Sequence, residues 1–306
     1  MADVNLSSSN PDVLTPEFKK VFYEKYRQLP SKIDMFYTKE SKGPRGDVTK
    51  FSEIGGQTNW TEFNGNVQYE AVQEGYDVTL EHKEFTKGFQ LERKLMDDDL
   101  TGIYSQKPRT MGSAYARTRE EHAARIFNQA FAVDNFFYTH TEGVALCSDS
   151  HTTRSGASTS VGFDNVSTDA LSATAVATAR IAMRKYRDAE ANRISVTPNE
   201  ILFPVDLYET ADEIIRSMGK VGTELNNTNV HEGAYKGIDW EYLTDTNNWF
   251  MMDSNARSEM LFWIDRIPVE FEFIEDFDTI IAKWRGYSRY SMGYNDWRWI
   301  YGANVS

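Results

Sequence analysis

The residues with the most obvious potential for chemistry lie in one short segment, Cys147-Ser-Asp-Ser-His151. A thiol or hydroxyl nucleophile needs a base within hydrogen-bond reach and a third group that orients the base. Neighbours in sequence rarely satisfy that geometry, because catalytic triads are assembled from distant segments. The sequence also lacks the Gly-x-Ser-x-Gly pattern of a nucleophile elbow. We therefore predict a loop here, and a hydrolase that uses Cys147 to His151 is the weaker alternative.

No other group of side chains has the spacing of a metal or nucleotide site. Asp97-Asp-Asp99 offers carboxylates, but adjacent residues on a strand point to opposite faces, whereas hard cations need several converging oxygens. Gly219-Lys220 lacks the upstream glycine and the following hydroxyl of a phosphate-binding loop. The histidines do not have zinc-site spacing and are predicted to be surface or hydrogen-bonded polar residues: His82, His122, His140, His151 and His231. We predict no catalytic residue, no cofactor and no metal.

Composition excludes several classes of protein. An apolar content of 40% and an aromatic content of 13% exclude a mostly disordered chain. The net charge of -13 argues against a nucleic-acid-binding surface as the main function, because phosphate neutralisation needs clustered Lys and Arg. The single cysteine cannot form an internal disulfide. No apolar stretch reaches the roughly 18 residues of a membrane span, so we expect a protein that is made in a cytoplasm and enters no membrane.

The charge is uneven along the chain. Residues 1–52 hold nine Lys/Arg and seven Asp/Glu, which gives +2, so the remaining 254 residues carry -15. A mildly basic segment on an acidic body could steer one subunit toward its neighbour. A chance imbalance of two charges explains the same numbers and is the favoured interpretation.

From Phe51 to about Leu100 the pattern alternates with period two, which predicts a long antiparallel hairpin with Glu74-Gly75 between its halves. Its strands carry about as many charges as apolar groups, so the hairpin has little core of its own. We expect it either to lie on its own domain or to reach another subunit. Its aromatic residues are candidate inter-subunit contacts: Trp60, Phe63, Tyr69 and Tyr76.

Helical periodicity predicts four helices. The first starts at Thr15, the second covers about 112–133, the third runs from Ser167 or Thr168 to about Ala189, and the fourth begins after a capping box of Asp206 and Glu209. The second has an apolar face and a charged face that is expected to lie in water: Arg117, Arg119, Glu120, Glu121 and Arg125. Three of these are further candidate inter-subunit contacts: Arg117, Arg119 and Glu120.

Strands are predicted at 194–196, 201–203, 249–252 and 268–274 and in the final aromatic run. They mix with the helices without the strict alternation of a parallel sheet, which favours an α+β fold.

Several motifs in the second half carry a family resemblance. They are Pro198-Asn-Glu-Ile-Leu-Phe-Pro204, Leu243-Thr-Asp followed by Trp249-Phe-Met-Met-Asp253, and Tyr290-Ser-Met-Gly-Tyr-Asn-Asp-Trp-Arg298. Their order resembles the major capsid (major head) proteins of tailed double-stranded DNA bacteriophages, especially the Mu-type major head subunits, which have the Hong Kong 97 fold. The resemblance spans roughly residues 35–302.

The resemblance implies a structural major capsid protein and not an enzyme. Such a protein self-assembles into hexamers and pentamers that form the icosahedral head around the DNA genome, which it encloses without sequence-specific binding. It is found in the virion and is made and assembled in the host bacterial cytoplasm. The alternatives are an encapsulin-like shell protein, which shares the fold, and a minor head or decoration protein. We see no scaffolding segment and no fused protease in the sequence, so a separate scaffolding protein and a portal are expected partners, and a decoration protein is a further candidate.

The same resemblance implies a domain organisation. Residues 1–50 correspond to an N-terminal arm and residues 51–90 to the E-loop hairpin, which lies over a neighbouring subunit in that family. Residues 91–139 and 267–290 correspond to the peripheral domain, with its spine helix at about 112–133. Residues 140–266 and 291–306 correspond to the axial domain, a mixed sheet flanked by helices.

Overall fold

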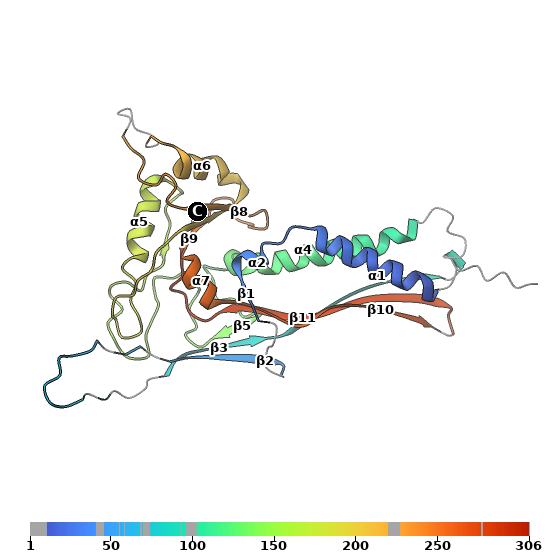
Figure 1. Cartoon of the computed structure of the whole chain (residues 1–306), viewed down its shortest axis with the longest axis horizontal. Helices are drawn as coiled ribbons and strands as arrows, with labels where there is room; N and C mark the ends of the chain where they lie inside the picture. The colour runs from blue at the N-terminus through green and yellow to red at the C-terminus, as the bar shows by residue number, and fades with distance from the viewer. Residues whose placement is uncertain are drawn as a thin grey trace, which may run out of the picture.

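The computed structural model describes residues 11–40, 46–54, 56–57, 59–67, 69, 74–92, 94–95, 103–219, 227–276 and 278–305. Two long helices lie along a long strand pair at one end of an elongated molecule, and shorter strands with α5 and α6 form the other end (Figure 1). Helices and strands mix without a regular βα repeat. The predicted α+β class is confirmed.

The long end is built on a four-stranded sheet in the order β1-β10-β11-β4. Its strands are β1 (Thr38–Glu40), β4 (Lys83–Glu92), β10 (Leu261–Asp276) and β11 (Ile281–Tyr294). β10 and β11 form a long antiparallel pair, and the strand predicted at 268–274 covers only part of the second half of β10. This pair joins the two ends of the molecule (Figure 1).

Two helices lie side by side along this sheet, α1 (Pro11–Gln28) and α4 (Gln106–Asn128). α4 has 23 residues, which makes it about 34 Å long. It begins and ends earlier than the predicted 112–133. Gly112 lies inside the helix where α1 crosses it, and the close approach requires a glycine: a Cβ at this position would be 2.7 Å from the backbone oxygen of Phe22.

A second sheet joins β2 (Val48–Ile54), β3 (Glu74–Glu81) and β5 (Tyr138–His140) in that order. β2 and β3 are antiparallel, but Glu74 and Gly75 belong to β3 and form no turn. The described residues from 59 to 67 lie in no strand. The predicted hairpin is therefore a short strand pair with a long connecting segment, since the polar sequence there has no partner strand to bond in the subunit.

The third sheet, in the order β6-β12-β9-β7-β8, forms the other end. Its strands are β6 (Val166–Ser167), β7 (Glu200–Phe203), β8 (Lys236–Asp239), β9 (Trp249–Met252) and β12 (Ile300–Ala303). Every residue of β7, β9 and β12 is buried, which explains why these strands are apolar apart from Glu200, whose carboxylate pairs with Arg257. The strands predicted at 201–203 and 249–252 are confirmed, whereas residues 194–196 form none.

Helices α5 (Ala173–Met183) and α6 (Tyr208–Arg216) belong to this end (Figure 1). α5 is shorter than predicted because Val166 and Ser167 pair with β12, so the helix starts only after its cap, Ser172. The predicted capping box at Asp206 is wrong, because a 3-10 turn (η2, Val205–Leu207) precedes α6 and no side chain caps it. The remaining short helices are α2 (Ile33–Phe36), α7 (Ser254–Met260) and the 3-10 turn η1 (Ile103–Ser105).

Two hydrophobic clusters stabilise the molecule. The larger one fills the third sheet and extends under the C-terminal half of α4. The smaller one lies between α1, α4 and the far part of the first sheet, and its buried residues are Phe18, Phe22, Leu91, Met111, Phe271, Ala282 and Trp284. None of the helices in the described ranges has the length and apolar content needed to cross a membrane.

Candidate functional site

The segment between β2 and β3 carries the most exposed aromatic side chains of the described residues. Trp60 is 98% exposed, Tyr69 91% and Phe63 73%. Figure 1 shows this segment leaving the body of the molecule at the lower left. Single apolar residues are common on surfaces, but several on one projecting segment indicate an interaction site. Three of the predicted contact residues are therefore free to reach a partner.

Polar contacts hold the root of this segment to the body. Asn59 Nδ2 donates to Asn192 Oδ1 at 3.2 Å, and Asn192 Nδ2 donates to the backbone oxygen of Gln57 at 3.2 Å. On β3, the hydroxyl of Tyr76 shares a hydrogen bond of 2.7 Å with Thr152 Oγ1. Tyr76, the fourth aromatic candidate, is thus bound within its own subunit.

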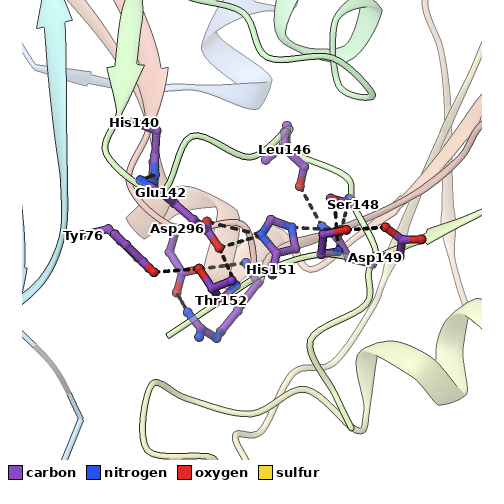
Figure 2. Close-up of polar contacts among 12 residues, drawn as sticks. Tyr76, His140, Glu142, Leu146, Ser148, Asp149, His151, Thr152 and Asp296 are labelled. Atoms are coloured by element: carbon purple, nitrogen blue, oxygen red, sulfur yellow. Dashed lines mark hydrogen bonds and ion pairs between the residues drawn. The ribbon is translucent and has the colours of Figure 1, made fainter. Parts of the chain in front are cut away.

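His151 lies at the centre of a buried polar network beside this root (Figure 2). Its Nδ1 is 3.2 Å from Oε1 of Glu142, and its Nε2 is 3.2 Å from Oδ1 of Asn165. The ring stacks on Trp297 with 4.2 Å between centroids. Both ring nitrogens are within hydrogen-bond distance of side chains of the same subunit, so the ring is held in place inside the network.

Glu142 completes the network. Its Oε1 also accepts the backbone N–H of Thr152 at 2.7 Å (Figure 2). Burial raises the pKa of Glu142, but the hydrogen bonds from His151 and from the Thr152 N–H outweigh burial and hold the pKa below its ordinary value. The carboxylate therefore stays charged and ties the loop after β5 to the loop that contains His151.

Cys147 has none of the properties of a nucleophile. Its side chain is 3% exposed in the larger hydrophobic cluster, and burial raises the pKa of the thiol far above its usual range. The reactive form of cysteine is the thiolate, which this environment disfavours. Residues 147–151 form a loop, as predicted. The hydrolase alternative gains no support from this geometry.

The other histidines are hydrogen-bonded, as predicted. Their partners are Thr49 and Ser291 for His82, Tyr290 for His122, the Asn295 carbonyl for His140 and the Ala173 carbonyl for His231. Across the described part of the chain, no cluster of His, Cys, Asp and Glu could hold a metal ion. Asp97-Asp-Asp99 and Lys220 lie outside the described residues.

The charged face of α4 is not uniformly in water. Arg119 is 5% exposed, and its Nη1 and Nη2 donate to the two oxygens of Asp265 at 2.8 and 3.0 Å. Glu120 is also 5% exposed and accepts the backbone N–H of Lys32 at 3.3 Å. The prediction that both side chains lie in water is wrong, because β10 and the segment after α1 cover this face. Arg117 is exposed, as predicted.

Sequence reasoning missed the partners of these residues. Glu142, Asn165 and Trp297 surround His151, and Asp265 pairs with Arg119. No local pattern joins these segments, since each pairing depends on how the sheets meet. The only usable signal was the polar character of residues 140–166, which marked a loop and not its contacts.

Comparison with known proteins gives the family. A sequence profile of the phage capsid protein family matches residues 75–303, which is more than half of the chain. The chain belongs to the phage capsid protein family. None of the curated proteins matches this sequence. As a phage capsid protein it is a structural component of the virion, and the family match supports neither the encapsulin-like nor the hydrolase alternative.

Solved capsid structures share the fold of this phage capsid protein. The capsid of a native GTA particle is 12% identical, covers 91% of each chain and has a TM-score of 0.57. The Bacteriophage JBD30 capsid is 13% identical over 71% of this chain and 92% of that chain, with a TM-score of 0.56. A chain from Mycobacterium phage Patience is 8% identical over 99% and 91%, with a TM-score of 0.58. The predicted Hong Kong 97-like fold is confirmed, and the Mu-type branch stays a prediction.

Proposed function

We propose that this phage capsid protein is the major subunit of an icosahedral head and that its copies associate into hexamers and pentamers around double-stranded DNA. The observation that carries the proposal is the projecting segment with Trp60, Phe63 and Tyr69 in water. Large aromatic side chains are typical anchors of protein interfaces, because they bury much apolar area when a partner covers them. A closed shell offers each subunit an identical partner at every equivalent position.

We also propose the domain organisation that the resemblance implies. Residues 51–90 form the E-loop, residues 91–139 and 267–290 the peripheral domain, and residues 140–266 and 291–306 the axial domain. The two hydrophobic clusters support a division into two parts. Phe18 and Phe22 of α1 belong to the smaller cluster, so this part of the proposed arm at 1–50 is packed into the proposed peripheral domain.

The proposed partners beyond the chain itself are a separate scaffolding protein, a portal and a decoration protein. DNA is proposed as enclosed cargo without sequence-specific binding. The net charge of -13 supports this part of the proposal, because a surface that bound phosphates tightly would need clustered basic residues.

Replacing residues 57–72 by a short Gly-Ser linker tests the assembly role. β2 ends at Ile54 and β3 begins at Glu74, so both strands remain and the subunit should fold. We expect circular dichroism close to that of the unmodified protein but no shells in negative-stain electron microscopy. A second variant keeps the length and changes Trp60, Phe63 and Tyr69 to Ser, which separates loss of the aromatic rings from loss of the segment. Normal shells from both variants would refute the proposal.

A further inference from the structure

The projecting segment between β2 and β3 contains the sequence Asn64-Gly65, and the chain has no other Asn-Gly pair. An asparagine side chain loses ammonia when the backbone nitrogen of the next residue attacks the side-chain amide carbon. Glycine in that next position hinders the attack least, because it has no Cβ and its backbone reaches more conformations than that of other residues. Among the asparagines of the chain, the sequence therefore favours this reaction most at Asn64.

The structure leaves both residues free to react. Asn64 and Gly65 are exposed and lie in no strand or helix, and neither has a hydrogen-bond partner among the described residues. Gly65 has a φ of +106°, and apart from its chain neighbours nothing lies within 4 Å of the position that a Cβ would take. A backbone N–H in a helix or sheet is held in a hydrogen bond, whereas that of Gly65 can turn toward the amide of Asn64.

Other asparagines show what hinders the same reaction. Asn165 is buried, and its Nδ2 donates to the backbone oxygen of Leu146 at 2.8 Å, so its side chain cannot turn toward the next backbone nitrogen. Asn66 is exposed in the same segment as Asn64, but Val67 follows it. The branched Cβ of valine crowds its own backbone nitrogen. Asn66 is thus a control within the same segment, which shares the exposure of Asn64 and lacks the glycine.

We propose that Asn64 is a site of spontaneous deamidation. The backbone nitrogen of Gly65 attacks Cγ of Asn64, and the new C–N bond closes a succinimide ring. The bond from Cγ to the amide nitrogen breaks, and this nitrogen leaves as ammonia with the proton that the Gly65 nitrogen gives up. Water then opens the ring at either carbonyl, which leaves aspartate or isoaspartate without any change of oxidation state. Either product replaces a neutral amide by a carboxylate.

The reaction alters the segment through which the subunit is proposed to assemble. Asn64 directly follows Phe63 and lies close in sequence to Trp60, and both aromatic side chains are exposed. Isoaspartate lengthens the main chain at this point, and a partner that covers the aromatic rings has to desolvate the new carboxylate beside them. Subunits that stay unassembled therefore lose the ability to assemble with time. This consequence rests on the proposed function, whereas the reaction itself does not.

Peptide mapping of the full-length, unassembled subunit by mass spectrometry tests the reaction. During incubation in mildly alkaline buffer, Asn64 should be converted many-fold faster than Asn66, and both aspartate and isoaspartate should form. Gly65→Ala should slow the conversion many-fold, because the added methyl group hinders the attacking nitrogen, and circular dichroism should show an unchanged fold at this exposed position. Equal rates at Asn64 and Asn66, or aspartate without isoaspartate, would overturn the proposal.

Shell yields from fresh and incubated subunits test the consequence. The unmodified protein should lose yield several-fold as Asn64 is converted, whereas Asn64→Gln, whose longer side chain cyclises far more slowly, should keep the yield of its fresh sample. Equal yields from fresh and deamidated subunits, or an equal loss in both proteins, would overturn the consequence and leave the modification site in place. Absence of shells from the fresh, unmodified protein would count against the proposed function itself.

Discussion

At the residue scale, two arginines on α4 show how position decides what a charge contributes. Arg119 is 5% exposed, pairs with both oxygens of Asp265 and lies over the ring of Trp263 at 4.8 Å. Arg117 is exposed, and its Nε is 3.7 Å from Glu121. A buried ion is costly once its partner is removed, whereas an exposed pair contributes little.

Arg119→Ala is expected to lower the free energy of unfolding by about 3 kcal/mol. This loss is at the low end for a broken buried ion pair, because the Asp265 side chain is 27% exposed and can be partly hydrated. Arg117→Ala is the matched control and should change it by less than about 0.5 kcal/mol. Urea unfolding of the unassembled subunit measures both. Equal losses would contradict the different burial of the two side chains.

His122 should make the subunit less stable in weak acid. Burial lowers its pKa from 6.5 to about 4, and Arg125 nearby acts in the same direction. The unfolded chain therefore binds a proton near pH 6.5 that the folded chain accepts only near pH 4. The contribution of the neutral ring is fully present above pH 6.5 and is lost as the pH falls toward 4. His122→Gln, which keeps a partner for Tyr290, should flatten this loss of stability in thermal unfolding between these pH values.

At the element scale, the crossing of α1 and α4 depends on Gly112, which has no side chain. A Cβ at Gly112 would lie 2.7 Å from the Phe22 backbone oxygen, which cannot rotate away as a side chain can. The crossing places Phe22 beside Met111 in the smaller hydrophobic cluster.

Gly112→Ala is expected to destabilise the subunit although alanine favours a helix over glycine by about 1 kcal/mol. The added methyl group must push α1 away from α4 and open the packing around Phe22. A lower melting temperature in calorimetry is the expected result. Thr110→Ala, at an exposed position of the same helix, is the control and should leave the melting temperature unchanged or slightly raised. A more stable Gly112→Ala variant would show that the helices can separate freely.

At the scale of the whole molecule, the acidic charge constrains how a shell can hold DNA. Residues 53–306 carry -15, and the nine basic and seven acidic residues before them change the total only to -13. DNA is itself densely negative, and a lining that bound phosphates tightly would hinder its movement during packaging and ejection. A weakly repulsive wall, screened within about 10 Å at 0.1 M salt, avoids this.

We therefore expect that the inner wall of an assembled shell is not strongly basic. An electrostatic map calculated on a cryo-electron microscopy structure of the shell measures this directly. The acidic residues could instead face outward and leave a basic lining. A continuous positive inner surface would establish that arrangement and refute the prediction.

The sequence by itself determined the features that depend on local pattern. The apolar runs of β7 and β9 and the polar loop at Cys147 to His151 were predicted because burial and turn formation leave a signature in neighbouring residues. The family followed from motifs in the second half, and its fold came with it. The sequence also has no residue pattern with the spacing of a catalytic, metal or nucleotide site, and this pointed to a structural role.

Only the tertiary structure decided what depends on distant segments. Gly112 lies inside α4 at the point where α1 approaches, and Arg119 is buried because β10 brings Asp265 to it. In the first half of the predicted hairpin only the residues up to Ile54 pair with β3, whereas the described residues from 59 to 67 lie in no strand. Local preferences are worth fractions of a kcal/mol per residue, so long-range contacts decide such boundaries.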